Sequence, residues 1–92
     1  MLSDGFQWID RWQYAHGELA LILDGAHVAH LVQRINGEWI ARLDVHKPIT
    51  ARLVTRACTD RDTGKAGIEA WACRHEARLR VEVAAGTPPR RP

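Results

Sequence analysis

Residues 19–43 decide the fold of this chain, and they read LALILDGAHVAHLVQRINGEWIARL. The stretch holds three apolar runs separated by two dipeptides, Asp24-Gly25 and Asn36-Gly37, which favour the two-residue turns of β-hairpins. Apolar residues alternate with period two in the first run and again in the third, as they do in strands with one buried face. The stretch therefore predicts three antiparallel strands joined by two hairpins.

The predicted turns also set the register of the strands. The first turn pairs Leu21 with Val28, and the second pairs His30 with Leu43. Alternating aromatic residues before this stretch predict a further strand, which a turn at His16-Gly17 joins to the first run. In this register of four strands in chain order, one face collects the apolar residues Trp8, Trp12, Tyr14, Leu19, Leu21, Leu23, Val28, Val32, Trp39, Leu43 and Val45. A slip of one residue in any one hairpin would divide this set between the two faces.

The second half of the chain predicts an edge strand and a helix. Lys47-Pro48 ends the fourth strand, and alternation over residues 50–58 indicates a fifth strand or an extended edge segment. Acidic and hydroxyl residues from 59 to 63 then offer N-caps for a helix. The spacing of a helix runs from about Lys65 to Val83, in a stripe formed by Ile68, Trp71, Ala72, His75 and Leu79. The predicted fold is α+β: an antiparallel four- to five-stranded meander with one C-terminal helix packed on one face.

Length and composition indicate one globular domain. The chain has 92 residues, of which 46% are apolar, and a formal net charge of +2. We expect residues 1–85 to form the domain and residues 86–92 to be a disordered basic tail. No apolar run is long enough to span a membrane, and the first residues do not resemble a signal peptide, so we expect a cytoplasmic protein. Its two cysteines are expected to be buried thiols.

The charge is divided unevenly along the chain. Residues 1–46 hold three arginines and six acids, which gives −3. Residues 47–92 hold ten bases and five acids, which gives +5. An electrostatic partner is therefore expected to meet the second half.

The sequence offers little catalytic or metal-binding chemistry. The predicted register places His27 opposite His46, with Asp44 nearby, a set that suits a metal ion in a small metal-dependent enzyme. That is the weakest of three functional hypotheses, because no motif with metal-ligand spacing accompanies these residues and a surface histidine pair explains them better. No nucleophile has an adjacent base. We therefore expect no catalytic residue, no bound metal and no cofactor.

Two surfaces are candidates for binding a partner. The sheet face away from the helix carries more apolar residues than a solvated face needs, and its candidate contacts are Ile22, His27, Ile40, Arg42 and His46. The other surface is a basic edge formed by Arg52, Arg56 and Arg61. These surfaces favour a non-enzymatic protein-binding module, with homodimerisation left open. The alternative is a small DNA-binding protein that uses the basic edge and the tail.

Two resemblances accompany these hypotheses. The segment Gly37–Leu43, followed by Glu69-Ala70-Trp71 on the predicted helix, resembles the arm-binding N-terminal domain of phage tyrosine integrases, whose three-stranded sheet enters the DNA major groove. This chain departs from that domain in its extra strand and in the few bases on its strands, and we expect no recombinase domain to follow it. As a whole, the chain resembles small phage and prophage proteins of the anti-CRISPR kind. That resemblance implies an inhibitor that binds a CRISPR effector complex in the cytoplasm of a host cell.

Overall fold

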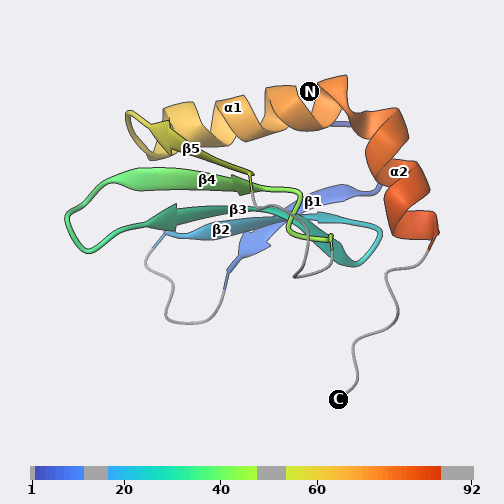
Figure 1. The fold of residues 1–92 in the computed structure, drawn as a ribbon, viewed down its shortest axis with the longest axis horizontal. Helices are drawn as coiled ribbons and strands as arrows, with labels where there is room; N and C mark the ends of the chain where they lie inside the picture. The colour runs from blue at the N-terminus through green and yellow to red at the C-terminus, as the bar shows by residue number, and fades with distance from the viewer. Residues whose placement is uncertain (1, 12–16, 48–53, 86–92) are drawn as a thin grey trace, which may run out of the picture.

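The computed structural model describes residues 2–11, 17–47 and 54–85. One antiparallel sheet contains, in chain order, β1 (Phe6–Asp10), β2 (Leu19–Leu23), β3 (Ala26–Gln33), β4 (Trp39–Leu43) and β5 (Val54–Cys58). Two helices follow, α1 (Arg61–Arg74) and α2 (Glu76–Ala84). α1 runs along one face of the sheet, and α2 turns down across its end (Figure 1). The predicted α+β fold with an antiparallel meander is confirmed, whereas the single predicted helix is two helices.

The helical segment starts earlier than predicted and is interrupted once. Asp60 caps α1, because its carboxylate accepts a hydrogen bond from the backbone N–H of Thr63 at 2.8 Å. At His75 the backbone leaves the helical region, with φ −112° and ψ 14°. The N–H of Leu79 still donates to the carbonyl of His75 at 2.9 Å, so the hydrogen-bonded chain continues through the bend. The bend lets α2 follow the end of the sheet and bury Leu79 in the same core as Ile68 of α1.

The core lies between the helices and one face of the sheet. Its buried members are Leu19, Leu21, Leu23, Val28, Ala29, Leu31, Ala41, Leu43, Ile68, Trp71, Ala72 and Leu79. Trp8 and Trp39 pack against this cluster from β1 and β4. The indole N–H of Trp8 donates to Glu69 at 2.7 Å, which ties β1 to α1. The predicted apolar stripe of the helix is confirmed except at His75, which is only half-buried.

The first hairpin follows its prediction only near the turn. Asp24 and Gly25 adopt the positive φ angles, 49° and 86°, that a two-residue turn requires. Farther along, Leu21 lies opposite Ala29, because Val28 is the extra residue of a β-bulge. Val28 and Ala29 are both buried in the core. The predicted pairing of Leu21 with Val28 is therefore wrong.

The second hairpin has a longer loop than predicted. The N–H of Arg34 donates to the carbonyl of Glu38 at 2.8 Å, and the N–H of Gly37 donates to the carbonyl of Arg34 at 2.9 Å. Gly37 has a φ of 90°, so the loop has three residues and ends in a left-handed glycine. His30 consequently pairs with Arg42. The predicted pairing of His30 with Leu43 is therefore wrong. The bulge and the longer loop each shift the register by one residue, so β4 still turns its predicted apolar residues toward the core.

These two shifts exchange residues of β3 between the faces of the sheet. Leu31 is fully buried in the core, although it was predicted on the face turned away from the helices, the far face. Val32 was predicted in the core and lies on the far face, opposite Ile40. His30 also lies on the far face, so its predicted position toward the core is wrong.

β1 pairs with β2 at a different position from the predicted one. Trp8 lies opposite Leu21, where Trp12 was expected. Next to the last paired residues of β1 and β2, the N–H of Arg11 donates to the carbonyl of Glu18 at 3.0 Å and continues the backbone pairing. The pairing of the two strands is displaced by an even number of residues. The side chain of Trp8 therefore still points to the face of the sheet that was predicted for it.

Several predictions fall outside the described residues. They are the strand positions Trp12 and Tyr14, residues 50–53 of the fifth strand and the tail at residues 86–92. The expectation of two buried thiols is corrected, since Cys73 is exposed and Cys58 is half-buried. None of the helices in the described ranges is long and apolar enough to cross a membrane.

Candidate functional site

The outer edge of β5 is the first candidate surface. β5 pairs with β4 on one side, and within the described residues no strand pairs with its other side. All of its residues except the last are exposed, including Val54 at 40%. An edge of this kind presents a row of unpaired backbone N–H and C=O groups. It can therefore accept a further strand.

A groove of about 210 Å³ lies between β5 and α1. The buried side chains of Leu43, Ile68 and Trp71 contribute its apolar lining. Arg56 and Thr63 line it as well, and both are exposed. Apolar walls with a few polar groups are the usual composition of a binding site. We call this feature the β5–α1 groove.

Two glycines of α1 shape the β5–α1 groove. A Cβ atom at Gly64 would lie 2.7 Å from Leu31 Cδ1 and 3.1 Å from Cys58 Sγ, so this turn of the helix touches the sheet. A Cβ atom at Gly67, about one turn later, would meet nothing within 4 Å. Helix and strand are thus in contact at Gly64 and leave open space beside Gly67. Two glycines three positions apart inside a helical pattern are the sequence signal by which the groove could have been found.

The predicted basic edge contributes Arg56 to this groove. Arg56 is exposed and forms no ion pair with another described residue. Arg61 is held by its own chain, since its Nε donates to the Gly17 carbonyl at 2.8 Å and its Nη1 lies 3.9 Å from Asp62 Oδ1. Arg52 lies outside the described residues.

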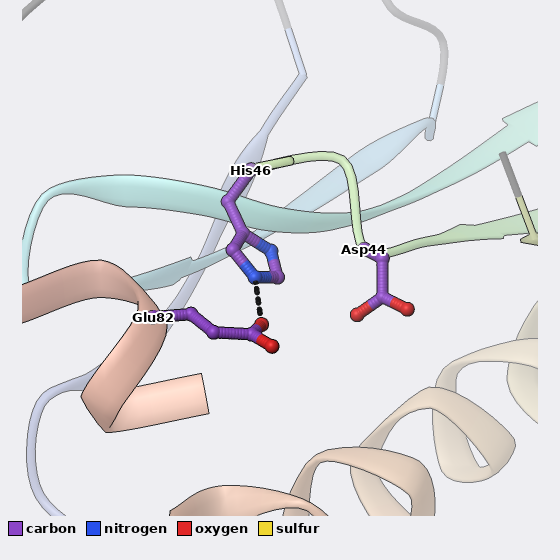
Figure 2. A group of neighbouring side chains, drawn as sticks. All are labelled: Asp44, His46 and Glu82. Carbon is purple, nitrogen blue, oxygen red and sulfur yellow. Dashed lines mark hydrogen bonds and ion pairs between the residues drawn. The ribbon is translucent and has the colours of Figure 1, made fainter. Parts of the chain in front are cut away.

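A second group of polar side chains joins the turn after β4 to α2. Figure 2 shows Asp44, His46 and Glu82 together, with the imidazole of His46 pointing to the carboxylate of Glu82. His46 Nε2 lies 2.5 Å from Glu82 Oε1, and only 2% of the His46 side chain is exposed. Asp44 has a φ of 59° just after the end of β4, where the chain turns toward the helices. His46 therefore lies on the helix side, and its predicted position on the far face is wrong.

The guanidinium group of Arg78 lies between the carboxylates of Asp44 and Glu82. Arg78 Nη1 is 3.1 Å from Asp44 Oδ1 and 3.0 Å from Glu82 Oε1. Burial alone would raise the pKa of Glu82, but hydrogen bonds from His46 and Arg78 outweigh it and hold that pKa below its ordinary value. His46 Nδ1 is buried without a hydrogen bond in the described structure, which fits a ring that carries its proton on Nε2.

The cluster has ligand spacing but not the vacancy that a metal ion needs. Atoms of Asp44, His46 and Glu82 that could hold a metal lie within 4.8 Å of one another. The Arg78 guanidinium already bridges the two carboxylates, and Lys47 Nζ lies 3.8 Å from Asp44 Oδ2, so the negative charges are balanced. We interpret the cluster as an anchor that fixes α2 to the end of β4.

His27 lies on the other side of the sheet from this cluster and contacts His30 instead. On the far face, His27 Nδ1 is 3.0 Å from His30 Nε2. Burial, together with the charges of His27, Arg11 and Arg42, lowers the pKa of His30 to about 4. The predicted metal set that joined His27 to His46 is not formed, because the two residues lie on opposite sides of the sheet.

The predicted partner surface on the far face loses its apolar residues. Ile22 and Ile40 are 9% and 7% exposed, so they offer almost no contact area although they face away from the helices. His27 and Arg42 remain exposed there. The exposed side chains at these positions are therefore polar, and the role of this set in binding a partner stays a prediction.

Comparison with known proteins adds no relative. No protein-family model matches this chain, and no curated protein or solved structure matches it either. The integrase and anti-CRISPR resemblances stay predictions.

Proposed function

We propose that the chain is a non-enzymatic protein-binding module that takes up an extended segment of another protein along β5. The observation that carries the proposal is an open strand edge beside the β5–α1 groove. A segment added to this edge pairs its backbone with β5 and places alternate side chains on the helix side of the sheet. Backbone pairing then supplies affinity, and the groove supplies selectivity.

The lining of the groove indicates the chemistry of the bound segment. The apolar walls at Leu43, Ile68 and Trp71 suit one apolar side chain of the partner. Arg56 pairs with Ala41 of β4, so its side chain belongs to the helix side and can meet a carboxylate. Side chains two positions apart in a strand share a face. The favoured partner segment therefore carries an apolar residue with an acidic residue two positions away.

The substitution Gly67→Leu tests the groove. A side chain at position 67 enters open space, so leucine fills the groove without disturbing the core. Short random peptides selected by display on the wild-type chain serve as ligands, and calorimetry measures their affinity. We expect G67L to weaken binding at least about tenfold, which is about 1.4 kcal/mol. The control is Ala66→Leu, which adds the same side chain at an exposed position outside the groove and should leave affinity unchanged.

A second variant tests the charge preference. Arg56→Glu should remove the preference for acidic peptides and select basic ones in the same display experiment. Selection of no peptide, or equal affinity of wild type and G67L for a selected peptide, would contradict the proposal. So would a homodimer that sedimentation detects and Arg56→Glu dissociates, because it would assign the edge to a second copy of the chain.

The resemblance in type to anti-CRISPR proteins makes a CRISPR effector complex the first partner to test. As an inhibitor, the expressed chain should restore plaque formation by a phage that an active effector targets. G67L should lose this effect while A66L keeps it. If G67L and A66L restored plaque formation equally, the inhibition would not depend on the β5–α1 groove.

A further inference from the structure

A second concave surface lies on the far face, beside the loop that joins β3 to β4. Its volume is about 650 Å³, and its polar lining consists of Arg11, Arg34, Arg42, Glu18, Gln33 and Asn36. Residues 1–46 contain three basic residues, and all three of them line this one surface. The fold thus gathers every arginine of a segment whose net charge is −3. We call this surface the arginine concavity.

The carboxylate of Glu18 and the amide oxygen of Asn36, two acceptors of the arginine concavity, are already engaged. Glu18 accepts from Arg11 Nη1 at 3.0 Å and from the backbone N–H of Gln33 at 2.8 Å. Asn36 Oδ1 accepts from the backbone N–H of Glu38 at 3.0 Å, which leaves the NH₂ group of Asn36 to donate. The groups that remain for a ligand are therefore mainly donors.

Two positive charges in the concavity are uncompensated. Arg11 is matched by Glu18, whereas Arg34 and Arg42 are exposed and form no ion pair within the described ranges. His30, beside Arg42, adds no charge near neutral pH, because burial and the neighbouring charges lower its pKa to about 4. A site with two unmatched guanidinium groups favours an anion that accepts several hydrogen bonds, as a phosphate does.

The concavity also has an apolar side. Ile35 at the tip of the loop is fully exposed, with a relative exposure of 109%, and it lines the surface together with Val32. An exposed isoleucine between arginine and asparagine has no packing role in the chain. Bases of nucleic acids are flat, stack on guanidinium planes and pack against apolar side chains in the pockets that hold them.

We infer that the arginine concavity binds a nucleotide unit, with its phosphate on Arg34 and Arg42 and its base against Ile35. The same chemistry comes from a free nucleotide or from one unit of a single strand. This surface lies apart from the basic edge and tail that the sequence suggested for DNA binding. It also lies on the other side of the sheet from the β5–α1 groove.

The test measures binding of two probes at low salt. The probes are adenosine monophosphate, followed by NMR, and a fluorescent oligothymidylate, followed by anisotropy. Arg34→Gln and Arg42→Gln should each weaken binding about five- to tenfold and, for the strand, reduce the slope of log K against log salt by about 0.7. Arg74→Gln removes the same charge from an exposed position of α1 and should change affinity about twofold or less.

Each outcome decides the inference. Binding of the strand alone assigns a nucleic acid, and comparable binding of the free nucleotide assigns a mononucleotide; both support the site if R34Q and R42Q weaken it. No binding of either probe at low salt would overturn the inference. Equal effects of R34Q, R42Q and R74Q would overturn it as well, because they would show attraction by net charge alone. Circular dichroism checks that the variants, all at exposed positions, keep the fold.

Discussion

Glu82 joins α2 to the turn after β4 through His46, beside a second link between Arg78 and Asp44. It accepts from the buried His46 and from Arg78, so Glu82→Gln leaves His46 without a charged acceptor and leaves Arg78 with Asp44 alone. We expect this substitution to lower the free energy of unfolding by about 1–3 kcal/mol at neutral pH. Urea denaturation measures the change, with Glu38→Gln at an exposed loop position as the control. A loss no larger than that of E38Q would remove the anchoring role.

The same carboxylate should give the protein part of its acid sensitivity. The pKa of Glu82 in the folded chain lies below its ordinary value of 4.5. A depressed folded pKa contributes stability that is complete above about pH 4.5 and is lost as the pH falls through the folded pKa. We therefore expect the stability of the wild type to fall more steeply below pH 4.5 than that of E82Q. Urea midpoints between neutral and acid pH measure this, and parallel curves for the two proteins would contradict it.

At the scale of elements, the two glycines of α1 should respond in opposite directions. Gly64→Ala places a Cβ atom 2.7 Å from Leu31 Cδ1 inside the core, so we expect a loss of about 1–3 kcal/mol despite the better helix propensity of alanine. Gly67→Ala meets open space and should stabilise the protein by about 0.5–1 kcal/mol. Thermal or urea unfolding separates the two variants. Changes of the same sign would show that α1 does not approach the sheet as described.

The elements themselves were predictable because their signals are local. Alternation along the strands, the turn at Asp24-Gly25 and the helical stripe through Ile68 depend only on neighbours in the chain. The register was not predictable, because a bulge at Val28 follows from how β3 packs and not from its own pattern. Gly37 fits a two-residue turn and a three-residue loop equally well, so the sequence could not choose between them.

The candidate sites were less predictable than the elements because they depend on packing between distant segments. Glu82 meets His46 only through the bend at His75, which interrupts an otherwise continuous helical pattern. Arg42 was expected among apolar contacts and instead joins Arg11 and Arg34 in a polar concavity. Only the complete fold shows which of the exposed arginines gather in one place.

At the scale of the whole molecule, the sheet separates two surfaces of different chemistry. The helix side offers the β5–α1 groove with Arg56, and the far face offers the arginine concavity. The first half of the chain has a net charge of −3, yet it supplies the more strongly basic of these surfaces. Net charge along the sequence therefore does not predict where arginine side chains gather on the surface, because folding brings distant residues together.

This separation predicts that the two proposed sites bind independently. No charged residue lines both surfaces, and the substitutions that test them lie on different faces of the sheet. Saturation with the nucleotide probe should change the affinity for a selected peptide by less than about twofold, since distant sites without shared partners behave additively. G67L should weaken only peptide binding and R42Q should weaken only nucleotide binding, with the double variant showing both losses. Calorimetric titration of peptide with and without nucleotide measures the coupling, and a change above about fivefold would mean that the sheet transmits binding from one face to the other.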